Sequence, residues 1–144
     1  MFKSILLPID GSELSEKATA TAIQFARLNQ AGIVAVTVVQ PLPLAPVGDG
    51  SVMVDGQFGT ELQDAARAHI DAAGAAISAA GIPFQGLIMM SASPSDEIVE
   101  AAKKYNCDII LMASHGRTGL DKLLLGSETQ KVLTHCTIPV LIVR

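Results

Sequence analysis

The sequence predicts an α/β fold in which helices cover both faces of a doubly wound parallel sheet. Short, nearly continuous apolar runs alternate along the chain with segments whose apolar residues recur at helical spacing. Such runs are typical of parallel strands, because both faces of these strands are buried. Of the 144 residues, 49% are hydrophobic and only 3% are aromatic, which favours close packing of aliphatic and alanine side chains. We expect one domain over residues 1–144.

The beginning of the chain predicts two strands joined by a helix. The apolar run over residues 5–9 is the first strand, and it ends before Asp10. Ser12 is a good N-cap for the helix, which we expect Gly32 to end. The β-branched run over residues 33–39 is the second strand. Two strands joined by a helix of this length make a right-handed βαβ unit.

The middle of the chain predicts a long irregular segment, a helix and a third strand. Prolines and glycines exclude regular structure from most of residues 40–59, which could be a functional cover or a tolerated surface insertion. From Thr60 onward, apolar residues recur at helical spacing until Gly81 provides a stop. We expect the third strand over residues 84–90.

The last part of the chain predicts two more helix–strand units. Ser93 as N-cap and Pro94 as the first helical residue start one helix. Residues 108–113 form the fourth strand. Residues 127–130 have the form of a capping box, S-x-x-Q, with serine as the N-cap of the last helix. Residues 138–143 form the fifth strand, and an apolar edge strand of this kind needs a cover, such as a second copy of the chain.

The composition excludes several classes of protein. The net charge of −4 and the pI of about 5.2 argue against a nucleic-acid partner held by a broad basic surface. Cys107 and Cys136 form no metal-binding pattern, so we expect small buried residues in a reducing compartment. The N-terminal apolar run is too short for a signal sequence, and no run approaches the roughly 18 residues of a membrane span. We therefore expect a cytoplasmic protein with no membrane partner.

The expected ligand site lies at the carboxyl ends of the strands, where open α/β sheets bind ligands. Asp10 at the first strand end could accept hydrogen bonds from a ribose or an adenine amino group, or hold Mg²⁺; alternatively, it caps the first helix. Gly116 and the pair Gly126-Ser127 would contact phosphates through backbone N–H groups and the serine hydroxyl. A helix end contributes about 0.3–2 kcal/mol toward an anion, whereas a micromolar ligand needs about 8 kcal/mol. Burial of a base against Val38 and Met112 must therefore supply much of the affinity.

Other phosphate-binding and catalytic motifs are absent from the sequence. It contains no G-x-x-x-x-G-K-[ST], and no G-x-G-x-x-G follows the first strand. It has no G-x-S-x-G elbow, and the neighbours Ser114 and His115 are poorly placed to act as nucleophile and base. His115 is better interpreted as a residue that orders the loop or contacts a ligand.

Four segments carry a family resemblance that covers essentially the whole chain. They are Ile5-Leu6-Leu7-Pro8-Ile9-Asp10-Gly11-Ser12, Ser114-His115-Gly116-Arg117, Leu124-Leu125-Gly126-Ser127 and Pro139-Val140-Leu141-Ile142-Val143. Together they make the chain similar to the universal stress protein family. The resemblance implies a Rossmann-like, five-stranded parallel sheet in the order 3-2-1-4-5. It also implies a homodimer through the last strand, Val140 to Val143, and ATP binding in one branch of the family.

The nucleotide-binding branch of that family is marked by G-x-x-G, nine residues, and then G-[ST]. This chain reads Ala113-Ser114-His115-Gly116, nine residues, and then Gly126-Ser127, so Ala113 replaces the first glycine. The intact spacing resembles the binders of ATP or AMP. By matching position, the resemblance implies a site formed by Pro8, Ile9, Asp10 and Val38 at the base and ribose, by Met112, Ala113, His115, Gly116 and Arg117 in the middle, and by Gly126, Ser127, Glu128 and Thr129 at the phosphates. The side chain of Glu128 must point away from a triphosphate.

Three functional hypotheses follow from these residues. The first is a stress-response protein that senses or stores an adenine nucleotide and signals as a dimer. The second is a very slow ATPase with Mg²⁺ at Asp10, for which the sequence offers no evident base. The third is a nucleotide-free, dimeric interaction module that binds an unknown protein, its pocket made vestigial by Ala113.

Overall fold

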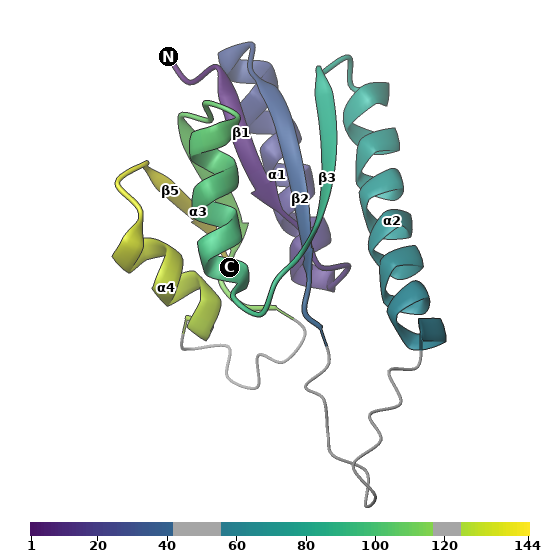
Figure 1. Cartoon of the computed structure of the whole chain (residues 1–144). Helices are drawn as coiled ribbons and strands as arrows, with labels where there is room; N and C mark the ends of the chain where they lie inside the picture. Colours follow the sequence, from purple (N-terminus) through teal and green to yellow (C-terminus); the bar gives the residue numbers. More distant parts are fainter. Residues whose placement is uncertain (42–55, 117–124) are drawn as a thin grey trace, which may run out of the picture.

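A computed structural model describes residues 1–41, 56–116 and 125–144. These residues form a five-stranded parallel sheet in the order β3-β2-β1-β4-β5 (Figure 1). The strands are β1 Ser4–Pro8, β2 Gly32–Val39, β3 Phe84–Met90, β4 Ile109–Ala113 and β5 Val140–Val143. The helices are α1 Glu13–Asn29, α2 Gly56–Ala79, α3 Pro94–Lys104 and α4 Ser127–His135. The predicted doubly wound sheet and its strand order are confirmed.

Helices cover both faces of the sheet, with α1 and α2 on one face and α3 and α4 on the other (Figure 1). Successive residues of β1 show why its sequence is continuously apolar. Ile5 and Leu7 belong to the core under α1 and α2, whereas Leu6 belongs to the core under α3 and α4. All three side chains are 0% exposed, as expected for a central strand of a parallel sheet.

The end of α1 differs from the sequence prediction. The helix stops at Asn29, and Gln30 takes the left-handed conformation with φ of 54°. The backbone N–H of Gln30 reaches the carbonyl oxygens of Ala26 and Arg27, so the last turn closes without a glycine. Gly32, expected to end the helix, is instead the first residue of β2.

The expected irregular segment was too long at its C-terminal end. Helix α2 begins at Gly56, four positions before the predicted start at Thr60. The remainder of that segment, residues 42–55, lies outside the described residues. At the other end of α2 the prediction is confirmed, because Gly81 follows the helix with a φ of 76°.

The strand order places a switch point between β1 and β4. From this pair, β2 and β3 extend the sheet in one direction and β5 extends it in the other. Crevices at the carboxyl ends of strands open at such a point. The polar residues that follow β1 and β4 are thereby brought together.

The two cysteines are free thiols. Cys107 is buried as expected, whereas Cys136 at the end of α4 is only partly buried. Within the parts of the chain that the structure describes, no helix has the length and apolar character needed to cross a membrane.

Candidate functional site

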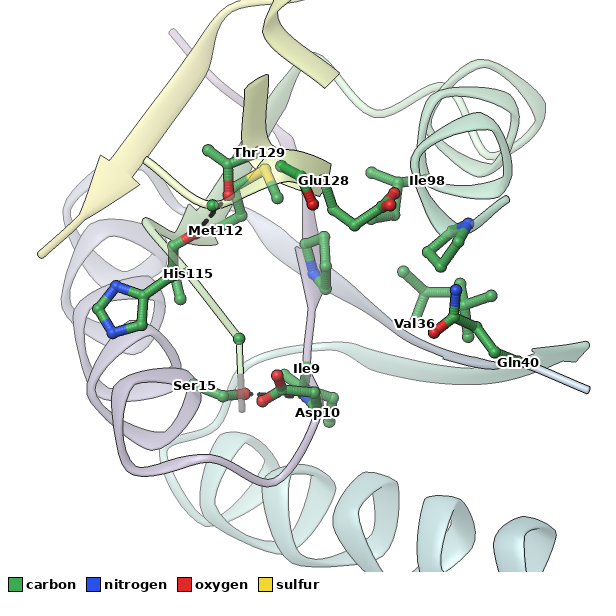
Figure 2. A pocket seen from close by; sticks show the side chains of 17 residues that line it. Ile9, Asp10, Ser15, Val36, Gln40, Ile98, Met112, His115, Glu128 and Thr129 are labelled. Carbon is green, nitrogen blue, oxygen red and sulfur yellow. Dashed lines mark hydrogen bonds between the residues drawn. The ribbon is translucent and has the colours of Figure 1, made fainter. Parts of the chain in front are cut away.

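A cavity of about 490 Å³ opens at the carboxyl edge of the sheet (Figure 2). Its lining comes from β1, β2, β4, the first turns of α1, α3 and α4, and the connections beside them. The described lining residues are Pro8, Ile9, Asp10, Ser15, Val36, Val38, Gln40, Pro94, Ile98, Met112, Ala113, His115, Gly116, Gly126, Ser127, Glu128 and Thr129. All predicted site residues are thus brought to one cavity except Arg117, which lies outside the described residues.

The turn after β1 is held by side-chain hydrogen bonds that position Asp10. Oδ1 of Asp10 accepts a 2.9 Å hydrogen bond from the N–H of Ser12. Its own N–H donates to Oγ of Ser15 at 3.2 Å. The N-cap of α1 is Ser12, whose Oγ accepts from the N–H of Ser15 at 3.1 Å. Asp10 therefore orders the turn through one carboxylate oxygen, while the prediction of Ser12 as the cap is confirmed.

The other oxygen of Asp10 lies toward the turn after β4. A Cβ atom added to Gly116 would lie 2.7 Å from Oδ2 of Asp10. The two strand ends therefore meet at these residues, and glycine allows the carboxylate to approach the backbone there. Within the described residues, no group of three or more histidine, cysteine, aspartate and glutamate side chains could hold a metal ion.

Apolar side chains form one wall of the cavity. Val36 and Val38 lie two positions apart on β2 and therefore on the same face. Ile98 of α3 and Met112 of β4 complete the wall, and both are 5% exposed. These side chains belong to, or pack against, the core under α3 and α4. The wall is consequently an apolar surface backed by the close-packed core.

Hydrogen bonds connect the turn after β4 to the neighbouring strand and helix. The N–H of Ser114 donates to the carbonyl oxygen of Val143 at 2.8 Å. Its carbonyl oxygen accepts from the N–H of Gly126 at 2.7 Å. Oγ of Ser114 lies 3.2 Å from Nδ1 of His115, closer than the sequence led us to expect of adjacent residues. Ser114 is 5% exposed and does not line the cavity, so this contact orders the loop.

The N-terminus of α4 differs from the predicted capping box. The N-cap is Gly126, with φ of −61° and ψ of 154°, and Ser127 is the first helical residue. The N–H of Gly126, which we expected to donate to a phosphate, instead donates to the carbonyl oxygen of Ser114 in this structure. The N–H groups of Ser127, Glu128 and Thr129 belong to the first helical turn, where intrahelical partners are missing. A glycine N-cap has no side chain to satisfy them.

Thr129 and Ala113 join the start of α4 to the end of β4. Oγ1 of Thr129 donates a 3.1 Å hydrogen bond to the carbonyl oxygen of Ala113. Thr129 is 2% exposed, so this contact is shielded from water. Ala113 packs against the core under α1 and α2. The methyl group that distinguishes Ala113 from the expected glycine is therefore accommodated by the protein interior.

Several lining residues were not predicted. They are Ser15, Val36, Gln40, Pro94 and Ile98. The alternation of side chains along a strand could have found Val36, because it shares a face with the predicted Val38. Pro94 and Ile98 come from α3, and the sequence carries no motif that directs the start of that helix toward the site.

Comparison with known proteins gives the family of this chain. The sequence profile of the Universal stress protein family matches residues 1–144, and the chain belongs to that family. A universal stress protein of Thermus aquaticus is 30% identical over 144 residues, covering 100% of both chains. The universal stress protein MJ0531 of Methanocaldococcus jannaschii is 32% identical, covering 100% of this chain and 83% of that protein.

Solved structures show the same fold. The structure of MJ0577 from Methanocaldococcus jannaschii has a TM-score of 0.83 at 28% identity, covering 99% of this chain and 96% of that chain. A universal stress protein in complex with cAMP has a TM-score of 0.72 at 23% identity, covering 99% and 97%. Another from Archaeoglobus fulgidus, in complex with dAMP, has a TM-score of 0.69 at 18% identity, covering 100% and 98%.

Proposed function

We propose that this universal stress protein binds an adenine nucleotide, ATP or AMP, and uses the bound state to sense or signal stress as a homodimer. One observation carries the proposal. The cavity combines an apolar wall for a base with a helix N-terminus, capped only by Gly126, for phosphate. The helix end would not suffice alone, because it supplies only about 0.3–2 kcal/mol toward an anion.

The apolar wall suits an adenine ring. Val36 and Val38 of β2 and Met112 of β4 come from the two strands that flank β1, and Ile98 lines the cavity from α3. The cavity volume of about 490 Å³ lies within the range of roughly 300–1,000 Å³ that small-molecule sites occupy. Asp10 adds a carboxylate beside this wall that can accept hydrogen bonds from ribose hydroxyls or from the adenine amino group.

The start of α4 suits a phosphate group. The first-turn N–H groups of Ser127, Glu128 and Thr129 and the positive end of the helix dipole provide the attraction. The hydroxyl of Ser127, an exposed residue that lines the cavity, adds a further donor. If Mg²⁺ accompanies the nucleotide, Asp10 could give it one carboxylate oxygen, and phosphate and water oxygens would supply the rest.

The packing of Ala113 supports this proposal over the nucleotide-free alternative. Its methyl group is taken up by the core under α1 and α2, so the lost glycine need not cost ligand space. The dimer is proposed from β5, which lies at one edge of the sheet and whose Leu141 side chain is 36% exposed. A second chain that pairs along Val140–Val143 would cover this edge.

Thermal unfolding with added nucleotides tests the proposal. A ligand at 100 times its Kd stabilises the folded state by about 2.7 kcal/mol, which corresponds to a rise in Tm on the order of 5–10 °C. AMP or ATP should raise the Tm, whereas GMP and GTP, with the same phosphates and a different base, should raise it less. If no adenine nucleotide raises the Tm, the proposal fails and the nucleotide-free interaction module is favoured.

A further inference from the structure

Glu128 connects the starts of two helices at the rim of the cavity. It is the second residue of α4, yet its Oε2 accepts a 2.9 Å hydrogen bond from the backbone N–H of Ser95 in α3. Its Oε1 lies 3.2 Å from Nζ of Lys131. Glu128 lines the cavity, and Figure 2 shows its side chain on the α3 side, next to Ile98.

The carboxylate of Glu128 occupies the N-terminus of α3. Ser95 is the second residue of that helix, so its N–H is one of the donors that a helix leaves without an intrahelical partner. The N-cap Ser93 does not cap α3 with its side chain, because its Oγ donates to Oδ2 of Asp96 at 2.7 Å. The first residue of α3, Pro94, also lines the cavity. The second helix start at this site thus already holds an anion, which the protein itself supplies.

The charged side chains of the described cavity lining also disfavour additional anions. Among the described residues of the cavity wall, Asp10 and Glu128 are carboxylates and none is a lysine or an arginine. Lys131 neutralises Glu128 only in part, since its side chain is 55% exposed and does not line the cavity. A phosphate group that extends beyond the start of α4 therefore adds negative charge to a cavity whose described lining already carries the carboxylates of Asp10 and Glu128 and no lysine or arginine.

We infer that Glu128 selects the ligand by its phosphate number and makes the site prefer a nucleoside monophosphate, AMP, over ATP. The inference rests on the proposed function, because it concerns the same cavity. The start of α4 holds one phosphate, and the filled N-terminus of α3 denies the cavity a second anion position. Glu128 is thus a specificity-determining residue that acts by repulsion.

The test compares AMP and ATP binding by calorimetry, in EDTA so that no Mg²⁺ masks the charges, for the wild type and for Glu128→Gln. Glutamine keeps an oxygen that can accept from the N–H of Ser95 but removes the negative charge. The wild type should bind AMP more tightly than ATP. In the variant, the ratio of the ATP Kd to the AMP Kd should fall about tenfold, as expected for the loss of one nearby like charge.

Two matched variants separate the local charge from other effects. Glu100→Gln removes a carboxylate that pairs with Lys103 at 3.0 Å across the same i,i+3 spacing, but on the exposed side of α3 away from the cavity. The ratio should be unchanged in this variant. Lys131→Met leaves the charge of Glu128 without its counter-ion, and the ratio should rise. Circular dichroism melts confirm that each variant folds.

The possible failures are distinct. If the wild type and Glu128→Gln bind adenine nucleotides with the same ATP-to-AMP ratio, or if the wild type prefers ATP, the role of Glu128 is refuted and the proposed function stands. If neither AMP nor ATP binds the wild type, the proposed function is refuted, and the inference with it.

Discussion

The N–H of Gly126 donates a 2.7 Å hydrogen bond to the carbonyl oxygen of Ser114, and this bond sets the start of α4 against the turn after β4. The two backbones lie so close that a Cβ atom on Gly126 would be 3.0 Å from Cα of His115 and 3.2 Å from its Cβ. The glycine therefore controls the distance between the turn and the helix start, which form one end of the cavity.

Gly126→Val should abolish the stabilisation by AMP or ATP while the protein still folds. The valine side chain must displace the backbone at His115, and it also occupies the cap of α4, where the phosphate is proposed to bind. Thermal unfolding with and without nucleotide measures the effect. Gly59→Val is the control, because a Cβ on Gly59 meets no described atom within 4 Å. A nucleotide shift that survives in Gly126→Val would refute the proposed phosphate position.

Thr129→Val should destabilise the fold by about 1–3 kcal/mol, because it leaves the carbonyl oxygen of Ala113 without its buried donor. Urea unfolding gives the change in free energy. Thr134→Val in the same helix is the control, since that exposed hydroxyl only donates to the carbonyl oxygen of Gln130 and its loss should cost within about 0.5 kcal/mol. Equal losses of unfolding free energy in the two variants would show that the hydrogen bond between Thr129 and Ala113 adds nothing to stability.

Cys107 should make the protein less stable at alkaline pH. Burial raises the pKa of its thiol above the ordinary 9.0; the hydrogen bond from Ser4 opposes this shift, and the charge of Asp108 adds to it. Well below pH 9.0, the thiol is protonated in both the folded and the unfolded protein. Above it, the unfolded chain loses the proton first, so the free energy of unfolding falls as pH rises.

Urea unfolding of the wild type and of Cys107→Ala, at about pH 7.5 and at about pH 10, isolates the effect of Cys107 ionisation on the free energy of unfolding. All other titrating groups are common to the two proteins. The loss of stability on going to the higher pH should be smaller for Cys107→Ala. A loss of the same size in both proteins would contradict the assignment to Cys107.

Leu141→Lys should shift the protein from dimer to monomer if β5 is the interface. Leu141 lies on the edge strand and is 36% exposed, and a lysine there would place a charge in the proposed strand pair. Sedimentation velocity measures the mass. Leu28→Lys is the control, because Leu28 is 86% exposed on α1, away from this edge. A wild type that sediments as a monomer would exclude the dimer.

The strands and their covering helices were predictable because burial on both faces leaves a clear apolar pattern. Leu6 lies between Ile5 and Leu7, yet all three are fully buried, and only a strand with helices on both faces allows this. The starts of two helices were also predictable, because serine is a common N-cap, as Ser12 is for α1, and proline is common at the first helical position, as Pro94 is in α3.

What could not be predicted depends on contacts between segments far apart in the sequence. The serine of the S-x-x-Q pattern is not the N-cap of α4, because Ser114, twelve positions before Gly126, holds that glycine at the cap. Glu128 turns toward Ser95 rather than toward its own helix, since the tertiary fold brings α3 beside α4. Sequence spacing carries no information on either arrangement.

Calorimetric titration of AMP into the wild type and into Gly126→Val tests whether this cavity binds an adenine nucleotide. We expect saturable binding to the wild type, one nucleotide per chain, and no measurable binding to the variant at the same concentrations. Equal binding to both proteins, or none to the wild type, would contradict the claim that this cavity is an adenine-nucleotide site.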